Sequence, residues 1–417
     1  MSKRNISISS LALVAILLLP ACQPTLPPFE CTDAIGCVDI APGEPLKLGV
    51  LQALSGGAVP IGAVQSQSIE LAIAQRGHQL LSHPIELQIE DSRCSPEGGT
   101  NAALKVATRQ QTVAILGTTC SGAATTAAKI MSEAGLVMVS GANGAPSLTA
   151  VDGERGADWQ PGYFRATYND AVLGRAAATF ALQELGATKT ATINDGDPYT
   201  QGLTEVFEQV FTELGGEIVL STAINKGDTD MHPVLTAVAA SGAELVFFPI
   251  FQPEGDFIVR QAREVAGLES IILMSSGALM VEPFIKAVDA DGVGMYFAGA
   301  AALQGSANDE LVSAYEARYG EPPQHVAYGY AYDAANLLLD AIEAVAVQEE
   351  DGTLHIGRQA LRDALYATAD FEGVTGSLTC DEFGDCGVAR FNIVRLDDPA
   401  AGFEELLSNV VYTYTPE

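Results

Sequence analysis

The sequence predicts an α/β protein of two doubly wound lobes joined by a hinge of several strands. Its 417 residues are more than one ordinary core accommodates and suit two lobes. Short aliphatic runs alternate with amphipathic stretches of helical length, which is typical of βαβ units on a parallel sheet. The alternation begins near residue 46 and begins again near residue 163. The strands are nearly all apolar, as expected when helices cover both faces of a sheet.

The elements follow one another in a regular order. In the first series the expected strands are 46–53, 85–91, 113–117 and 136–141, and the expected helices are 63–76, 97–110 and 123–134. In the second series the strands are 163–167, 188–195, 216–224, 244–250 and 270–275, and the helices are 170–185, 200–214, 232–241 and 255–266. Further helices at 309–320, 327–345 and 357–367 precede short strands at 373–380, 387–396 and 409–415.

The later elements must return to sheets that the chain has already built, so the chain crosses between the lobes several times. Such crossovers form a hinge beside a cleft. We expect lobe 1 to comprise 46–164 and 298–375, and lobe 2 to comprise 165–297 and 376–417.

The N-terminus has the features of a bacterial lipoprotein signal. Lys3 and Arg4 precede an apolar segment that is short for a membrane span. The segment ends in 19–22, Leu-Pro-Ala-Cys, and small residues before a cysteine resemble a lipobox. We therefore expect a signal peptide over 1–21, lipid on Cys22 and a proline-rich tether over 22–45. An ordinary signal peptide with a chance cysteine is the alternative.

Charge and cysteine content narrow the function classes. The 52 acidic and 21 basic side chains give a net charge of -31, which argues against nucleic-acid binding. Of the seven cysteines, six remain after lipidation, an even number that suits an oxidising compartment. Six cysteines allow fifteen pairings. Our hypothesis pairs Cys31 with Cys37, Cys94 with Cys120, and Cys380 with Cys386.

Loops after the strands are the expected ligand site, because ligands of open α/β sheets bind beyond the carboxyl ends of the strands. These loops carry hydroxyl groups, glycines and a few aromatics, and adjacent helix N-termini suit a carboxylate. The loops are 55–62, 118–123, 141–147, 196–202 and 251–255.

Catalytic signatures are missing from the sequence. It contains no G-x-S-x-G, H-E-x-x-H, Walker or G-x-G-x-x-G motif. Asp195 and Asp197 suggest an acid pair or a cation site, but aspartates between a strand and a helix are more often turn formers and caps. We expect neither an enzyme nor a cofactor nor a metal.

Four stretches resemble the type I periplasmic solute-binding proteins of ABC importers, in particular the leucine/isoleucine/valine-binding family. The resemblance extends over roughly 46–400. The stretches are "LGVLQALSGGAVPIGAVQSQSIELAI", "EDSRCSPEGGTNAALKVA", "AILGTTCSGAATTAAKIMSEAGLVMVSGANGAPSLT" and "FRATYNDAVLGRAAA".

The resemblance implies roles for individual residues. Cys94 and Cys120 match the family's disulfide, and Ser121 matches a serine that helps to hold an amino-acid carboxylate. Asp170 matches an aspartate near the ligand's ammonium group, and Tyr199 matches a tyrosine at the cleft. For Ser121 and Asp170 the alternative is a role as helix N-caps.

Other positions depart from the family pattern. Asn143 and Gly144 replace a usual hydroxyl residue, so the asparagine either takes over that contact or alters the carboxylate site. A glutamate for the ammonium group is replaced around Ser276. The remaining departures are Phe251 for a tyrosine, Ile61 for an aromatic in the first loop, and His325 near a pocket tyrosine.

The sequence thus predicts a periplasmic or cell-surface, lipid-anchored receptor that closes its lobes around a small polar solute and presents it to an ABC permease of the inner membrane. The solute is expected to be a branched-chain amino acid or a related small carboxylate, and the protein a monomer that touches the membrane only through its lipid. A sensor on the same scaffold, signalling to a partner protein, is the alternative. An enzyme is a weaker one.

Overall fold

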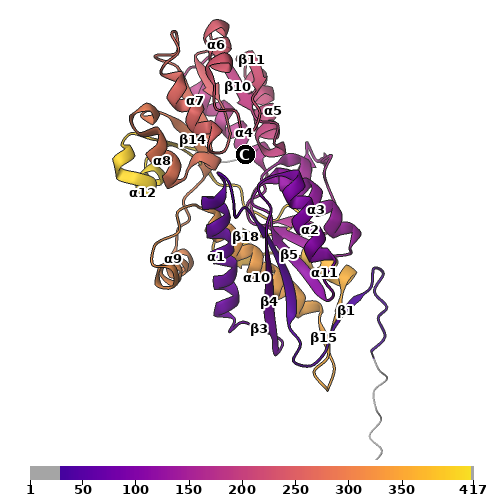
Figure 1. Cartoon of the computed structure of the whole chain (residues 1–417). Coiled ribbons are helices and arrows are strands. Elements are labelled where there is room, and N and C mark those ends of the chain that lie inside the picture. The colour runs from indigo at the N-terminus through magenta and orange to yellow at the C-terminus, as the bar shows by residue number, and fades with distance from the viewer. Residues whose placement is uncertain (1–28, 415–417) are drawn as a thin grey trace, which may run out of the picture. The chain divides into compact units, whose positions relative to one another are not determined.

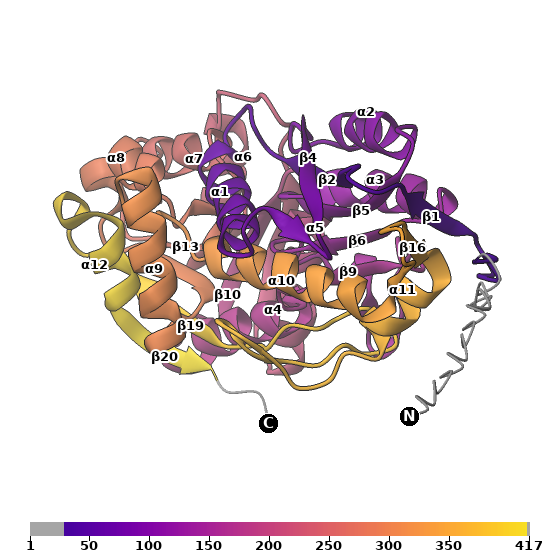
Figure 2. The same cartoon turned by 90° about the horizontal axis from the view of Figure 1, so that it is seen from below.

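The computed structural model describes residues 29–414, and two open α/β sheets organise this part of the chain (Figures 1 and 2). We call each sheet with its covering helices a lobe. The signal peptide and Cys22 lie outside the described residues, as do residues 23–28 of the segment expected as a tether. Within that segment, β1 (Cys37–Ile40) pairs antiparallel with β16 (Leu354–Gly357), so the residues just before lobe 1 join its folded structure.

Lobe 1 contains a six-stranded sheet in the order β3-β4-β2-β5-β6-β9, parallel except at the β3–β4 edge. Its strands are β2 (Leu46–Gln52), β3 (Gln79–Leu80), β4 (His83–Asp91), β5 (Thr112–Gly117), β6 (Val137–Ser140) and β9 (Tyr163–Arg165). One face packs against α2 (Pro96–Ala107) and α3 (Ser121–Glu133), and the other against α1 (Val59–Gln75), α10 (Ala327–Val345) and α11 (Arg358–Tyr366). Aliphatic side chains therefore fill both faces, which explains the apolar strands.

Lobe 2 contains a seven-stranded sheet in the order β11-β10-β12-β13-β14-β19-β20. The strands are β10 (Lys189–Asn194), β11 (Glu217–Ala223), β12 (Leu245–Phe247), β13 (Ile272–Ser276), β14 (Tyr296–Ala300), β19 (Phe391–Arg395) and β20 (Val410–Tyr414). The first five pair in parallel, whereas β19 and β20 are antiparallel. One face packs against α4 (Asp170–Thr179) and α5 (Pro198–Glu213). The other packs against α6 (His232–Ser241), α7 (Glu254–Ala262), α8 (Glu282–Val288) and α12 (Gly402–Ser408). Helix α9 (Ser306–Tyr319) lies beside α1, where the hydroxyl group of Tyr319 donates to the Gln67 carbonyl at 2.9 Å (Figure 1).

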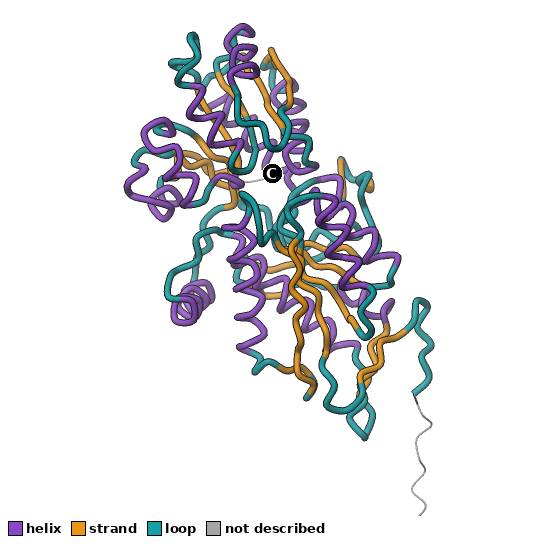
Figure 3. Tube along the Cα trace, in the orientation of Figure 1, coloured by secondary structure: helices purple, strands orange, loops and turns teal. Residues whose placement is uncertain are grey.

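Within residues 29–414 the chain passes between the lobes at three places. It leaves lobe 1 after β9, returns from β14 to α10, and re-enters lobe 2 at β19 (Figure 3). The predicted helix at 170–185 divides into α4 and a π-helical segment, Phe180–Glu184. The remaining short strands are β7 (Ala150–Val151), β8 (Glu154–Arg155), β15 (Val347–Gln348), β17 (Phe371–Gly373) and β18 (Gly376–Leu378), and the 3-10 turns are η1 (Pro146–Leu148), η3 (Gly277–Leu279), η4 (Asp289–Gly292) and η5 (Pro399–Ala401).

All three proposed disulfides are present: Cys31–Cys37, Cys94–Cys120 and Cys380–Cys386. The bond at Cys120 removes the free thiol that a cysteine nucleophile requires. Within residues 29–414, no helix combines the length and the apolar character that crossing a bilayer requires.

Candidate functional site

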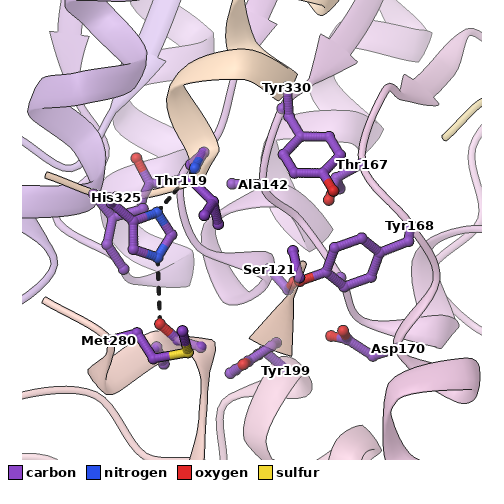
Figure 4. Close-up of a pocket in the computed structure, with 18 of the residues that line it drawn as sticks. Thr119, Ser121, Ala142, Thr167, Tyr168, Asp170, Tyr199, Met280, His325 and Tyr330 are labelled. Carbon is purple, nitrogen blue, oxygen red and sulfur yellow. Dashed lines mark hydrogen bonds between the residues drawn. The ribbon is translucent and has the colours of Figure 1, made fainter. Parts of the chain in front are cut away.

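A pocket between the lobes collects residues from all five loops that the sequence singles out (Figure 4). The loops lie beyond the carboxyl ends of β2, β5, β6, β10 and β12, as expected for an open α/β sheet. The residues that these loops contribute are Ile61, Thr119, Ser121, Gly141, Ala142, Gly144, Tyr199 and Phe251.

Asp170 supplies the negative charge of the pocket. It is the first residue of α4 and is 1% exposed, and its Oδ2 has no hydrogen-bond partner among the described residues. Burial raises the pKa of this carboxyl group to about 7, although the nearby Arg165 guanidinium opposes the shift. The cap of α4 is Asn169, whose side chain accepts the N–H of Ala171. The N-cap alternative for Asp170 is therefore wrong, and its carboxylate remains available to a ligand.

Gly144 allows the pocket loop to lie directly against this carboxylate. The Asp170 N–H donates to the Gly144 carbonyl at 2.9 Å. A Cβ at position 144 would lie 2.0 Å from Asp170 Oδ2, so any side chain here would displace the carboxylate. The departure from the family pattern at this position thus has a local steric reason.

Ser121 lies at the first turn of α3, where Cys120 occupies the cap position. Its Oγ accepts the N–H of Ala145 at 3.2 Å, which leaves the hydroxyl hydrogen available as a donor. The N-cap alternative for Ser121 is also wrong. The N–H groups of a first helical turn have no partner inside the helix and favour an anion. This end of the pocket therefore suits a carboxylate.

Tyr199 and Phe251 form an aromatic wall from lobe 2. Their ring centroids lie 5.4 Å apart. The Tyr199 hydroxyl donates to Ser276 Oγ at 2.7 Å, and burial raises the pKa of this phenol, so it is neutral. Ser276 does not line the pocket; its predicted ligand contact is replaced by a role in positioning Tyr199.

His325 lines the pocket, but both of its ring nitrogens are engaged. Nδ1 accepts the N–H of Ala327 at 3.1 Å, so Nε2 carries the hydrogen that faces the Gly277 carbonyl at 3.3 Å (Figure 4). Burial lowers the pKa of His325 to about 4. The imidazole ring is therefore neutral, forms part of the pocket lining, and joins the start of α10 to η3 through these two hydrogen bonds.

Asn143 lies behind the pocket rather than in its lining. Its Oδ1 accepts from the Tyr163 hydroxyl at 3.2 Å and from the Thr118 N–H at 3.3 Å. The side chain is fully buried and holds the loop between β6 and η1 in place. It does not replace a hydroxyl at the ligand.

Several lining residues were missed by the sequence interpretation. Tyr168, on the crossing segment before α4, packs edge-on against Tyr330 of α10. The repeated tyrosines of the sequence "YGYAY" were the available signal for Tyr330. Phe403 and Leu407 come from α12, a short helix that the sequence pattern did not predict. The lining residues absent from our prediction are Thr119, Gly141, Ala142, Thr167, Tyr168, Gly277, Ala278, Met280, Ala300, Val326, Ala327, Tyr330, Phe403 and Leu407.

Among residues 29–414, no group of three or more acidic, histidine or cysteine side chains is placed to hold a metal ion. Asp197 caps α5 by accepting the Tyr199 N–H, as the turn-and-cap interpretation predicts.

The comparison with known protein families decides the identity of this arrangement. Residues 45–399 match the Periplasmic binding protein family. The chain belongs to this family. A periplasmic binding protein of this kind binds a small solute for an ABC transporter, which supports the non-enzymatic interpretation and a periplasmic location.

Two curated relatives are similar to this periplasmic binding protein. A Leu/Ile/Val-binding protein homolog of Brucella melitensis is 24% identical over 356 residues, which cover 85% of this chain and 92% of the relative. An amino acid binding protein of Pseudomonas aeruginosa is 31% identical over 198 residues, 48% of this chain and 51% of the relative. The second match therefore spans about half of each protein. The predicted resemblance to the leucine/isoleucine/valine-binding proteins is confirmed by the first of these relatives.

Two solved structures share the fold. A branched-chain amino acid substrate-binding protein of Streptococcus pneumoniae, in complex with isoleucine, has a TM-score of 0.73 at 21% identity, covering 89% of this chain and all (100%) of the other. A solute-binding protein of R. palustris, in complex with benzoate, has a TM-score of 0.70 at 24% identity, covering 84% and 93%. At these identities the likeness shows the fold, and the type I periplasmic fold predicted from the sequence is confirmed.

Proposed function

We propose that this periplasmic binding protein is a lipid-anchored receptor of an ABC importer that captures a small aliphatic amino acid between its lobes. One observation carries the choice of ligand. The Asp170 carboxylate is buried, faces the pocket and has an oxygen without a hydrogen-bond partner among residues 29–414. A buried carboxylate without a partner is costly, and a ligand ammonium group relieves the cost by ion pairing.

The other groups that line the pocket fit the carboxylate and the side chain of an amino acid. The Ser121 hydroxyl and the first turn of α3 suit the carboxylate of the ligand. Figure 4 places Asp170 and Tyr168 on one side of the pocket and Met280 and His325 on the other. Apolar side chains, including Met280 and those of α12, suit an aliphatic tail.

Aromatic carboxylates are the second candidate. The lining holds Tyr168, Tyr199, Phe251 and Tyr330, and a related fold binds benzoate. A raised pKa near 7 allows Asp170 to remain protonated beside an anionic ligand. In that case no ammonium group is needed.

Isothermal titration calorimetry with L-leucine, L-isoleucine, L-valine, benzoate and 4-hydroxybenzoate tests the assignment. We expect saturable binding of at least one aliphatic amino acid and none of the aromatic acids at pH 8. Binding of benzoate without any amino acid would reject the assignment in favour of the second candidate. Mass spectrometry of the protein purified from membranes, with Cys22→Ser as the control, tests the lipid anchor separately.

A further inference from the structure

The seam between the lobes carries a polar contact that the ligand pocket does not use. Asp197, on the β10–α5 loop of lobe 2, has a fully buried side chain. Its Oδ1 accepts the N–H of Gly122 in α3 of lobe 1 at 3.3 Å. This bond joins the first turn of a lobe 1 helix to the cap of a lobe 2 helix.

Lys226 makes a second connection at the same place. It lies on the loop between β11 and α6, and its Nζ donates to Asp197 Oδ2 at 2.8 Å and to the Cys94 carbonyl of lobe 1 at 3.4 Å. Burial alone would lower the pKa of Lys226, but the carboxylates of Asp197 and Asp195 raise it, so the ammonium group is charged. Charge-assisted hydrogen bonds of this kind are stronger than neutral ones.

The Cys94–Cys120 disulfide holds the lobe 1 side of this contact together. Cys94 supplies the carbonyl that Lys226 reaches, and Cys120 immediately precedes the first turn of α3. The cross-link therefore fixes the acceptor and the Gly122 donor relative to each other. The disulfide therefore has a structural role at the seam between the lobes.

Glycines permit the close approach of the two lobes. A Cβ on Gly122 would lie 2.5 Å from Asp197 Oδ2. A Cβ on Gly57, in the first loop of lobe 1, would lie 1.8 Å from the Gln252 carbonyl oxygen of lobe 2. Neither Gly122 nor Gly57 lines the pocket, so their lack of a side chain serves the contact between lobes.

We propose that Asp197 and Lys226 are positioning residues for ligand binding, which latch the closed lobes through Gly122 and Cys94 without touching the ligand. The latch lowers the free energy of the closed state whether or not a ligand is present. Ligand contacts then need to contribute less of the free energy of closure, and bound ligand dissociates more slowly. The proposal rests on the proposed function only for its affinity measurement.

Two variants separate the latch from the folding of each lobe. Gly122→Ala places a methyl group against Asp197, yet alanine favours a helix more than glycine, so α3 itself is not weakened. Lys226→Met removes the charge from a side chain that is 40% exposed. Lys189→Met is the matched control, because Lys189 pairs with Glu217 at 3.9 Å inside lobe 2.

The measurements are the radius of gyration of the ligand-free protein by small-angle X-ray scattering and the L-leucine affinity by calorimetry. We expect both variants to increase the radius of gyration and to weaken leucine binding about tenfold, with the control unchanged. Unchanged scattering and affinity in Lys226→Met would overturn the latch, even if Gly122→Ala failed to fold. Should wild type bind none of the aliphatic amino acids, the ligand assignment fails, while the scattering comparison still decides the latch.

Discussion

Arg165 pairs with Asp385, and this ion pair connects the pocket loop to the disulfide loop near the C-terminus. The Arg165 side chain is fully buried and also donates to the carbonyls of Asn143 and Ala145, at 3.0 and 2.9 Å. Backbone bonds join Arg165 to Gly384 and Cys386 on either side of Asp385. The loop that lies against Asp170 is thus held from behind by a segment more than two hundred residues away in the sequence.

Removing the carboxylate of this pair should destabilise the protein. We expect Asp385→Asn to lower the free energy of unfolding by about 3 kcal/mol, because Arg165 would keep a buried charge without its partner. Asp397→Asn is the control, since Asp397 pairs with Arg395 at the surface, where a pair contributes about 1 kcal/mol or less. Urea unfolding measures both. Equal effects of the two substitutions would contradict the structural role of Asp385.

Asp170→Asn should weaken the binding of an aliphatic amino acid. An amide in place of the carboxylate loses the charge that pairs with the ligand ammonium, an effect of about 1.5–3 kcal/mol or roughly ten- to hundredfold in Kd. Calorimetry with L-leucine measures it, and circular dichroism checks that the variant is folded. An unchanged Kd would mean that Asp170 does not pair with an ammonium group of the ligand.

The pH dependence of binding separates the two ligand classes. With a pKa near 7, Asp170 becomes protonated as the pH falls, so leucine affinity should decrease about tenfold per unit below pH 7. Benzoate should show the opposite trend, because an anion is repelled by the ionised carboxylate. Titrations at pH 5.5, 6.5 and 8 distinguish these outcomes, and Asp170→Asn should flatten either curve.

The same group affects the stability of the ligand-free protein. Its pKa is near 7 when folded and 3.8 as an ordinary carboxyl group, so the folded state holds the proton more tightly. The contribution of Asp170 to stability is therefore present at low pH and is lost between about pH 4 and 7. Urea unfolding across this range should show a difference in the free energy of unfolding between wild type and Asp170→Asn, and this difference should grow with pH. A difference independent of pH would mean that the carboxyl pKa is not raised.

Two adjacent leucines of α12 provide a test of specificity. Leu407 lines the pocket, whereas Leu406 is buried in the core of lobe 2 and does not. Leu407→Ala should enlarge the pocket and shift the preference from valine toward larger solutes such as L-phenylalanine. Leu406→Ala should cost about 2–5 kcal/mol in stability and leave the order of ligand affinities unchanged. If Leu407→Ala also kept that order, α12 would not determine specificity.

The alternating elements of both lobes were predictable from the sequence because buried parallel strands and amphipathic helices have different hydrophobic periods. The five pocket loops could be predicted from the same pattern, because each loop comes directly after an apolar strand. Whether Asn143 or Ser276 faces the ligand depends on loop geometry, which no periodicity encodes. Helix α12 was missed because seven residues with three apolar side chains give too short a pattern. Strand β1 was missed because its partner β16 lies more than three hundred residues later.

The buried carboxyl group of Asp170 also has a thermodynamic consequence for capture itself. Near or below pH 7 the empty pocket holds a proton, and an ammonium ligand must replace it. Each captured amino acid then releases up to one hydrogen ion to the buffer, so the observed heat of binding depends on the ionisation enthalpy of that buffer. In this sense the pocket exchanges one cation for another.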